Sequence, residues 1–198
     1  TEKSEPLIKT FKTIQTPAAL PYDWDFESGN GWLFFNGELT NKWAYGTATS
    51  NSPTHALYIS NDNGLSYAYT HAYTTVYATK TFYFPEAGLY SFSFEWKANS
   101  DAYDYLRVAL APAATEVEAS SASTAPIGAT SLPDGWIALD GGNKLCGQSN
   151  WQRQLSEVEV PQAGYHKVII VWRNNSYTGD APGAIDNFKI SRLTCRMP

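Results

Sequence analysis

The amino-acid sequence predicts an all-β protein built as a sandwich of two antiparallel sheets. Aromatic residues make up 15% of its 198 residues, and charged residues make up only 17%. Chains that are rich in aromatic, Thr and Ser residues and poor in Lys and Glu favour strands over helices. No segment keeps an apolar period near 3.6 residues, so the sequence gives no sign of an amphipathic helix.

A polar N-terminal segment precedes the expected domain. Residues 1–20 are expected to form a tail or linker, and residues 21–198 a single domain. The segment around 111–134 is rich in Ala, Ser, Thr and Pro. We expect it to be a long surface excursion of that domain, because the strands after it are too few to form a core of their own. Further strands are expected at 22–27, 42–46, 55–60 and 103–110.

An internal repeat supports a two-sheet architecture. Residues 84–96 and 160–172 both read as a strand end, a Pro-x-Ala-Gly turn and a strand that ends in Trp. Gly supplies the unusual backbone angles of a tight turn, and Pro stops the preceding strand from pairing further. The sequence therefore predicts two equivalent hairpins, as a sandwich of two sheets would contain.

Charge and hydropathy argue against two classes of partner. The formal net charge is −5 and the chain has no run of basic residues, whereas binding to nucleic acid needs clustered Lys and Arg. No apolar stretch approaches the roughly 18–20 residues that span a bilayer. Cys146 and Cys195 could form one disulfide or remain two buried thiols, and no Cys/His spacing typical of zinc is present.

The most informative strand lies near the C-terminus and carries a misplaced carboxylate. Side chains alternate along a strand, so Asp186 is expected to share a face with Ala184, Phe188 and Ile190. That face should meet the core. A buried ionised carboxylate is costly unless it is paired, hydrogen-bonded or bound to a metal. We therefore expect Asp186 to have an ion-pair partner, hydrogen-bond donors or a bound metal ion.

The first expected strand offers a partner for Asp186. Terminal strands of a sandwich are often neighbours, so Glu27 and Asp186 could converge. Two carboxylates with backbone carbonyls would form a hard oxygen site that suits calcium, and the loop 61–64 could add ligands. The alternative is a structural hydrogen bond or an ion pair with Arg107 or Arg173.

Three carboxylates alternate on that first strand. Asp23, Asp25 and Glu27 are expected on one face, a layout similar to the acid/base pair of some jelly-roll glycoside hydrolases. The order here is Asp-x-Asp-x-Glu, whereas those enzymes carry Glu-x-Asp-x-Glu. A solvated strand face explains the pattern better. The chain also has no Gly-x-Ser-x-Gly motif and no phosphate-binding Gly loop.

An aromatic stripe provides candidate ligand-binding residues. Aromatic side chains occupy odd positions between 66 and 77, namely Tyr67, Tyr69, His71, Tyr73 and Tyr77. Such a stripe can be a platform on which sugar rings stack, or it can pack inward. Trp43 is a further candidate of the same kind. The predicted ligand-binding set is Tyr67, Tyr69, Tyr73 and Trp43.

Several short motifs, in this order, resemble the MAM domain and its bacterial relatives, which include the cleaved-adhesin domains of gingipains and similar modules of Bacteroidetes surface proteins. The resemblance covers 22–193. It rests on Trp24-Asp25-Phe26-Glu27, Gly31-Trp32, Trp43, Ala56-Leu57-Tyr58-Ile59-Ser60 and Ala184-Ile185-Asp186-Asn187-Phe188. It implies a concanavalin-A-like jelly-roll sandwich, a secreted or cell-surface location, and structural calcium held by Glu27 and Asp186. The disulfides of animal MAM domains are not implied, because most of their cysteines are missing here.

These observations lead to one prediction of function and two alternatives. The chain is predicted to be a non-catalytic adhesin or carbohydrate-binding module of a secreted or surface-exposed bacterial protein. It would act as a monomeric module within a larger chain and bind a glycan or a surface protein. The first alternative is a structural spacer or protein–protein interaction module without a glycan ligand. The second is a jelly-roll glycoside hydrolase.

Overall fold

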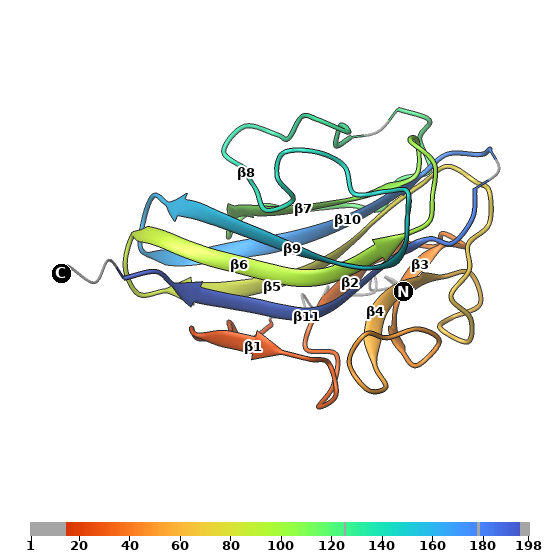
Figure 1. Ribbon diagram of the computed structural model, residues 1–198. Coiled ribbons are helices and arrows are strands. Elements are labelled where there is room, and N and C mark those ends of the chain that lie inside the picture. Colours follow the sequence, from red (N-terminus) through yellow and green to blue (C-terminus); the bar gives the residue numbers. More distant parts are fainter. Residues whose placement is uncertain (1–14, 125, 178, 195–198) are drawn as a thin grey trace, which may run out of the picture.

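The computed structural model describes residues 15–124, 126–177 and 179–194. These residues form two stacked antiparallel sheets and contain no helix, so none that could cross a membrane (Figure 1). The predicted all-β jelly-roll sandwich is therefore confirmed. The first sheet has the order β3-β4-β11-β6-β9, with β1 also paired to β11, and the second has the order β2-β5-β10-β7-β8.

The strands of the first sheet are β1 (Tyr22–Trp24), β3 (Lys42–Gly46), β4 (Ala56–Ser60), β6 (Gly88–Ala98), β9 (Gln148–Val160) and β11 (Gly183–Arg192). Those of the second sheet are β2 (Leu33–Phe35), β5 (Thr74–Phe84), β7 (Tyr105–Pro112), β8 (Ile137–Ala138) and β10 (Gly164–Asn174). Every pair of neighbouring strands is antiparallel.

The two repeated segments connect the sheets instead of forming hairpins. β5 lies in the second sheet and β6 in the first, whereas β9 lies in the first sheet and β10 in the second. We call each of these two connections, with its flanking strands, an arch. The strands of one arch pair with those of the other, since β5 pairs with β10 and β6 pairs with β9. Gly88 and Gly164 open the second strand of each arch with φ of 138° and 117°, which favour glycine. The repeat is thus a pair of matching crossovers between the sheets.

Alternation along the long strands separates a core face from an outer face. On β5 the even-numbered residues Val76, Ala78 and Phe82 belong to the core between the sheets. The odd-numbered residues of β5 therefore face outward. Phe94 and Phe188 stack in this core with their ring centroids 5.5 Å apart. The core is continuous across both layers, as a single sandwich requires.

The last six residues of the expected N-terminal tail belong to the fold. Ala18 forms a parallel bridge with Phe82, since its N–H donates to the Thr81 carbonyl at 2.9 Å and its carbonyl accepts from the Tyr83 N–H at 3.0 Å. Residues 15–18 thus satisfy part of the free edge of β5. Composition did not reveal this, because an edge segment pairs through its backbone, whatever its side chains are. Residues 1–14 lie outside the described part of the chain.

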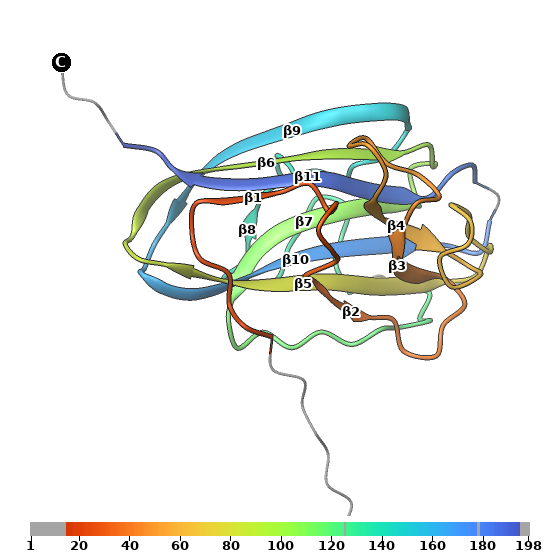
Figure 2. The same cartoon turned by 90° about the horizontal axis from the view of Figure 1, so that it is seen from below.

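The excursion between β7 and β8 packs on the outer face of the second sheet. Val117, Leu132 and Trp136 from the excursion contact a small apolar cluster that includes Tyr77 and Val171 from β5 and β10. In Figure 1 the excursion stands above β7, β8 and β10. It begins by crossing the sheet, as Figure 2 shows, where the segment after β7 runs past β5 to β2. This outer face is therefore covered over part of its length.

A β-bulge in β11 overturns the predicted orientation of Asp186. Asp186 pairs with Glu95 and Lys189 pairs with Ser93, so Asn187 and Phe188 together lie opposite a single residue of β6. Asn187 has φ of 50°, in the left-handed region. The extra residue shifts the alternation by one position, and as a result Ile185 and Phe188 both face the core. Asp186 points away from the core, yet it is fully buried.

The first strand also ends earlier than predicted. β1 stops at Trp24, and Phe26 has φ of 64°, a conformation that ends a regular strand. Asp23, Asp25 and Glu27 therefore do not line one strand face. The Asp23 carboxylate is 3.0 Å from the Lys189 ammonium, and the Asp25 carboxylate accepts the Glu27 N–H at 3.0 Å. The three carboxylates therefore do not form the predicted row, and each makes different contacts.

Candidate functional site

A cleft of about 730 Å³ lies on the outer face of the second sheet. This outer cleft is bounded on one side by the N-terminal segment and β2, and on the other by the start of the excursion. Its volume falls within the roughly 300–1,000 Å³ of small-molecule sites. It is lined by Gln15, Pro17, Leu33, Phe35, Thr79, Thr81, Ala113, Ala114, Thr115, Glu116, Val117, Tyr165 and Lys167.

The strand register sets the floor of the outer cleft. Thr81 lies opposite Lys167, and Thr79 lies opposite Leu33 on its other side. Residues that lie directly opposite each other point to the same face of a sheet, so all four side chains lie on its outer face. Thr81 and Lys167 therefore lie on a floor that is held by paired strands, and Thr79 is buried in it with 2% exposure.

Exposed aromatic rings flank this floor. Phe35 is 37% exposed and Tyr165 is 57% exposed. Tyr165 also packs against Tyr83, with their ring centroids 5.1 Å apart. The Lys167 ammonium donates to the Thr115 carbonyl, which ties the far wall to the floor. The outer cleft thus combines aromatic surface, hydroxyls and charged groups in one place.

Two of the four predicted ligand-binding residues are buried. Trp43 is 2% exposed, and its indole N–H donates to the Val76 carbonyl at 3.2 Å. Tyr69 is 8% exposed, and its hydroxyl donates to Asp104 at 2.6 Å. Burial raises the pKa of the Tyr69 hydroxyl well above its usual value. Neither ring offers a face on which a sugar could stack, so the structure contradicts these two assignments.

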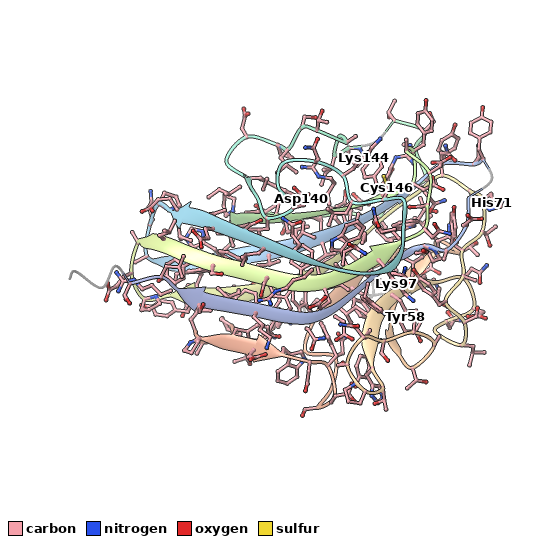
Figure 3. The ribbon with its side chains drawn as sticks, viewed as in Figure 1. Tyr58, His71, Lys97, Asp140, Lys144 and Cys146 are labelled. Atoms are coloured by element: carbon pink, nitrogen blue, oxygen red, sulfur yellow. The ribbon has the colours of Figure 1, made fainter. Side chains whose placement is uncertain are left out.

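The other two predicted rings are half-buried and already occupied. The Tyr67 hydroxyl donates to the Pro182 carbonyl, and the Lys97 ammonium lies 4.7 Å from the centre of its ring. Figure 3 shows Lys97 beside Tyr58 at this end of the sandwich. The ring of Tyr73 faces the Arg173 guanidinium at 5.5 Å. The predicted stripe fails as a unit because β5 begins only at Thr74, so residues 66–73 form a loop without strand alternation.

The structure brings Glu27 and Asp186 to the same loop. The Ser52 hydroxyl lies 3.1 Å from Glu27 Oε1 and 3.0 Å from each carboxylate oxygen of Asp186. Asp186 Oδ2 also accepts the N–H groups of Asn51 and Ser52 at 2.7 and 2.8 Å, and Glu27 Oε1 accepts the His55 N–H at 2.8 Å. We call this arrangement the carboxylate clasp. It joins the turn after β1 to β11 through residues 51–55.

The two carboxylates of the clasp have opposite pKa shifts. The Thr54 hydroxyl and the His55 backbone N–H lower the pKa of Glu27 to about 2, since they favour its charged form. Burial raises the pKa of Asp186, although the N–H groups of Ser52 and Asn51 oppose the rise. Asp186 is therefore the member of the clasp whose charge is least well compensated. Neither Arg107 nor Arg173 contacts it, because Arg107 pairs with Asp140 and Arg173 donates to the Asn174 and Ser123 carbonyls.

The clasp gathers several oxygen atoms around the Ser52 hydroxyl. Five oxygens surround the Ser52 hydroxyl within 2.8–3.3 Å, namely Asp25 O, Glu27 Oε1, His55 O, Asp186 Oδ1 and Asp186 Oδ2. The carboxylate oxygens also accept the backbone N–H groups of Asn51, Ser52, Thr54, His55 and Asn187, so both carboxylates are hydrogen-bonded without a cation. Within the described ranges, no three His, Cys, Asp or Glu side chains gather as a metal site. A cation here would therefore depend on two carboxylates and backbone carbonyls, which calcium accepts.

Sequence reasoning missed the two aromatic residues of the outer cleft, Phe35 and Tyr165. A signal was available in β5, where apolar residues at even positions fix the core face. The odd positions then carry Tyr77, Thr79 and Thr81 outward. The neighbouring strands that complete the cleft could not be ordered from the sequence. Cys195 lies outside the described residues, so its pairing with Cys146 stays a prediction.

No protein-family model and no curated protein matches this sequence. Solved structures match its fold. The CBM22-1 xylan-binding domain of Paenibacillus barcinonensis Xyn10C has a TM-score of 0.50 and 11% identity, over 86% of this chain and 92% of that chain. The tandem CBM22-1–CBM22-2 domain of the same protein reaches 0.52 at 11% identity, over 87% and 49%. The CBM22-1 and GH10 modules of Clostridium thermocellum xylanase 10B reach 0.51 at 14% identity, over 87% and 28%.

These structural neighbours are carbohydrate-binding modules with the jelly-roll sandwich seen here. At 11–14% identity the likeness concerns the fold. The narrower resemblance to MAM and cleaved-adhesin domains stays a prediction.

Proposed function

We propose that this chain is a non-catalytic carbohydrate-binding module that binds a glycan in the outer cleft. The observation that carries the proposal is the composition of the cleft: exposed rings of Phe35 and Tyr165 beside the half-buried Thr81, with the buried Thr79 in the floor. Sugars present apolar C–H faces to aromatic rings and hydroxyl groups to polar side chains. The floor is built on paired strands, which hold these groups in place without the cost of ordering a loop.

The fold shared with carbohydrate-binding modules supports this proposal, although fold alone does not fix function. One neighbour is described as xylan-binding, and another is complexed with xylohexaose. In our proposal the chain is a module of a secreted or cell-surface bacterial protein, as its resemblance to adhesin domains implies, and acts as a monomer within a longer chain. Its partner is a glycan, free or carried by a surface protein.

A catalytic role receives less support from the cleft. Glycoside hydrolysis commonly uses two carboxyl groups about 5–9.5 Å apart. Among the described residues that line the cleft, Glu116 is the one carboxylate. Asp23 and Asp25 lie on another part of the sandwich, where Asp23 pairs with Lys189. We therefore propose binding without turnover.

Replacing Phe35 or Tyr165 with Ala is expected to weaken glycan binding at least tenfold, because each change removes a stacking surface, and tenfold corresponds to about 1.4 kcal/mol. A glycan array first identifies the bound structures, and calorimetric titration then measures the affinity of each variant. Tyr103 is the matched control, since it is 69% exposed and lies outside the cleft.

The Tyr103→Ala variant should bind as the unmodified chain does. If Phe35→Ala and Tyr165→Ala bind with unchanged affinity, the cleft is not the site. If the unmodified chain binds no glycan on the array, the module is a spacer or binds a protein, and the proposal is wrong.

We also propose that the carboxylate clasp binds a structural calcium ion. Glu27, Asp186 and the carbonyls of Asp25 and His55 would supply the oxygens. A divalent cation would compensate the buried charge of Asp186 and hold the turn after β1 against β11. The competing arrangement is the hydrogen-bonded clasp alone, in which the N–H groups of residues 51–55 stabilise both carboxylates.

Calcium at 100 times its dissociation constant is expected to stabilise the fold by about 2.7 kcal/mol, which raises the melting temperature of a domain of this size by about 5–10 °C. The measurement is thermal unfolding in calcium and in chelator. Asp186→Asn should abolish the difference. Asp62→Asn should retain it, because Asp62 is held by Ser60 and Ser66 in a separate turn. Equal melting temperatures of the unmodified chain in calcium and chelator would overturn this proposal.

A further inference from the structure

The start of the excursion closes one end of the outer cleft. Ser120 forms an antiparallel bridge with Thr75, with N···O distances of 2.8 and 3.0 Å between their backbones. Arg173 of β10 already pairs with the opposite edge of Thr75. Ser120 must therefore occupy the same edge of β5 that β2 occupies, directly beyond the pairing of Phe35 with Tyr77.

The two walls of the cleft consequently converge. One wall is β2, from Leu33 to Phe35, and the other is the segment from Ala113 to Val117. The second wall starts over β10, where Thr115 accepts from Lys167, and ends on the β2 side of β5 at Ser120. Figure 2 shows this segment running past β5 to lie beside β2. The walls meet because the segment crosses the floor diagonally.

Packing seals the point where the walls meet. A Cβ atom placed on Gly37, in the turn after β2, would lie 3.2 Å from the Ala119 Cβ atom, so the turn and the excursion are in contact. Next to Phe35, Tyr77 is buried under the excursion together with Val171. No continuous groove therefore extends along the described outer face past Phe35.

The other end of the cleft is open. Tyr165 and Tyr83 stand there at 57% and 45% exposure, at the end of the sandwich where the arches turn. A chain that enters the cleft would leave across these two rings. Within the described residues the cleft is therefore open at this end, and its aromatic surface continues in that direction.

We infer that the outer cleft binds the terminal residues of a glycan chain and cannot accommodate an internal segment. This inference rests on the proposed function. An internal segment would need space on both sides of the bound sugars, and the contact between Ala119 and Gly37 removes that space on one side. The terminal sugar would lie against Phe35, and the rest of the chain would pass Tyr165.

The number of protein molecules bound per glycan chain tests this inference. Calorimetric titration would use xylohexaose, β-1,4-galactotriose and cellotriose, and then long linear polymers of the same sugars and linkages. For any sugar that binds, we expect one protein molecule per chain at every chain length. A binder of internal segments would show a number that rises with chain length, and that result would overturn the inference while leaving glycan binding established. If neither these sugars nor any glycan on the array binds, the proposed function itself fails.

Opening the closed end provides a second test. Ser120→Pro removes the N–H that donates to Thr75 and should release the crossing segment. This variant is expected to bind more than one molecule per long chain. Ser121→Pro is the matched control, since Pro favours an extended preceding residue, which Ser120 already is. The control should keep one molecule per chain. A Ser120→Pro variant that is folded and still binds one per chain would contradict closure by this segment.

Discussion

Replacing Asp140 with Ala is expected to lower the free energy of unfolding by about 3–5 kcal/mol, because it leaves a buried guanidinium without its counter-ion. The Arg107 and Asp140 side chains are 1% and 0% exposed, and their closest N···O distance is 2.6 Å. Arg107 also donates to the carbonyls of Gly128 and Ser131, and Asp140 accepts the N–H groups of Val108 and Gly142. Figure 3 shows Asp140 beneath the excursion. The pair therefore fixes the excursion to the second sheet.

The exposed pair of Lys189 and Asp23 is the matched control. These side chains are 49% and 68% exposed, with an N···O distance of 3.0 Å, so Asp23→Ala should cost no more than about 1 kcal/mol. Urea denaturation measures both variants. Adding Arg107→Met to Asp140→Ala should cost less than the sum of the single changes, because the unpaired charge is then absent. A loss below about 1 kcal/mol for Asp140→Ala would show that the pair does not fix the excursion.

Replacing Trp43 with Ala is expected to lower the free energy of unfolding by about 3–5 kcal/mol, as deletion of a large core side chain does. Trp43 is almost fully buried between the sheets, and its indole N–H bonds to the backbone of β5. The sequence had suggested a ligand-binding role, whereas the structure assigns it a role in the core. The two roles predict different results.

Trp43→Phe separates the two roles, because it keeps most of the apolar volume and removes the indole. It should destabilise less than Trp43→Ala and bind glycan as tightly as the unmodified chain. Tyr177→Ala is the control for loss of an aromatic ring, since Tyr177 is exposed, and it should change stability by less than about 0.5 kcal/mol. A tenfold loss of glycan affinity in folded Trp43→Phe would contradict the core assignment.

Strand pattern and composition were sufficient to predict the fold class, because alternation and aromatic content are properties of local sequence. The matching segments at 84–96 and 160–172 also predicted two related connections. Their actual role as crossovers between sheets depends on how distant strands pair. Local sequence does not encode that pairing, so the predicted hairpins were wrong.

The predicted orientation of Asp186 was wrong because β11 contains a bulge. Strict alternation predicted that Asp186 and Phe188 share a face. The bulge at Asn187 places one extra residue between them and reverses the parity. The convergence of Glu27 with Asp186 was nevertheless anticipated from the proximity of terminal strands, and the structure brings both to Ser52. The loop that supplies Ser52 could not be predicted, because its position follows from tertiary packing.

The candidate site was the hardest part to predict. Its aromatic residues, Phe35 and Tyr165, come from strands far apart in sequence, and its wall comes from the excursion. The stripe between 66 and 77 is contiguous in sequence, but residues 66–73 precede β5. A binding surface assembled from several strands leaves no contiguous signal.

Backbone amide chemical shifts recorded during titration with an oligosaccharide test whether the outer cleft binds a glycan. Xylohexaose is the first probe, followed by the oligosaccharides that the glycan array identifies. We expect the largest shift changes at Phe35, Thr79, Thr81, Tyr165 and Lys167, which line the outer cleft. Changes confined to the loops that carry Tyr67 and Tyr73, or the absence of changes with every probe, would show that the outer cleft is not a glycan site.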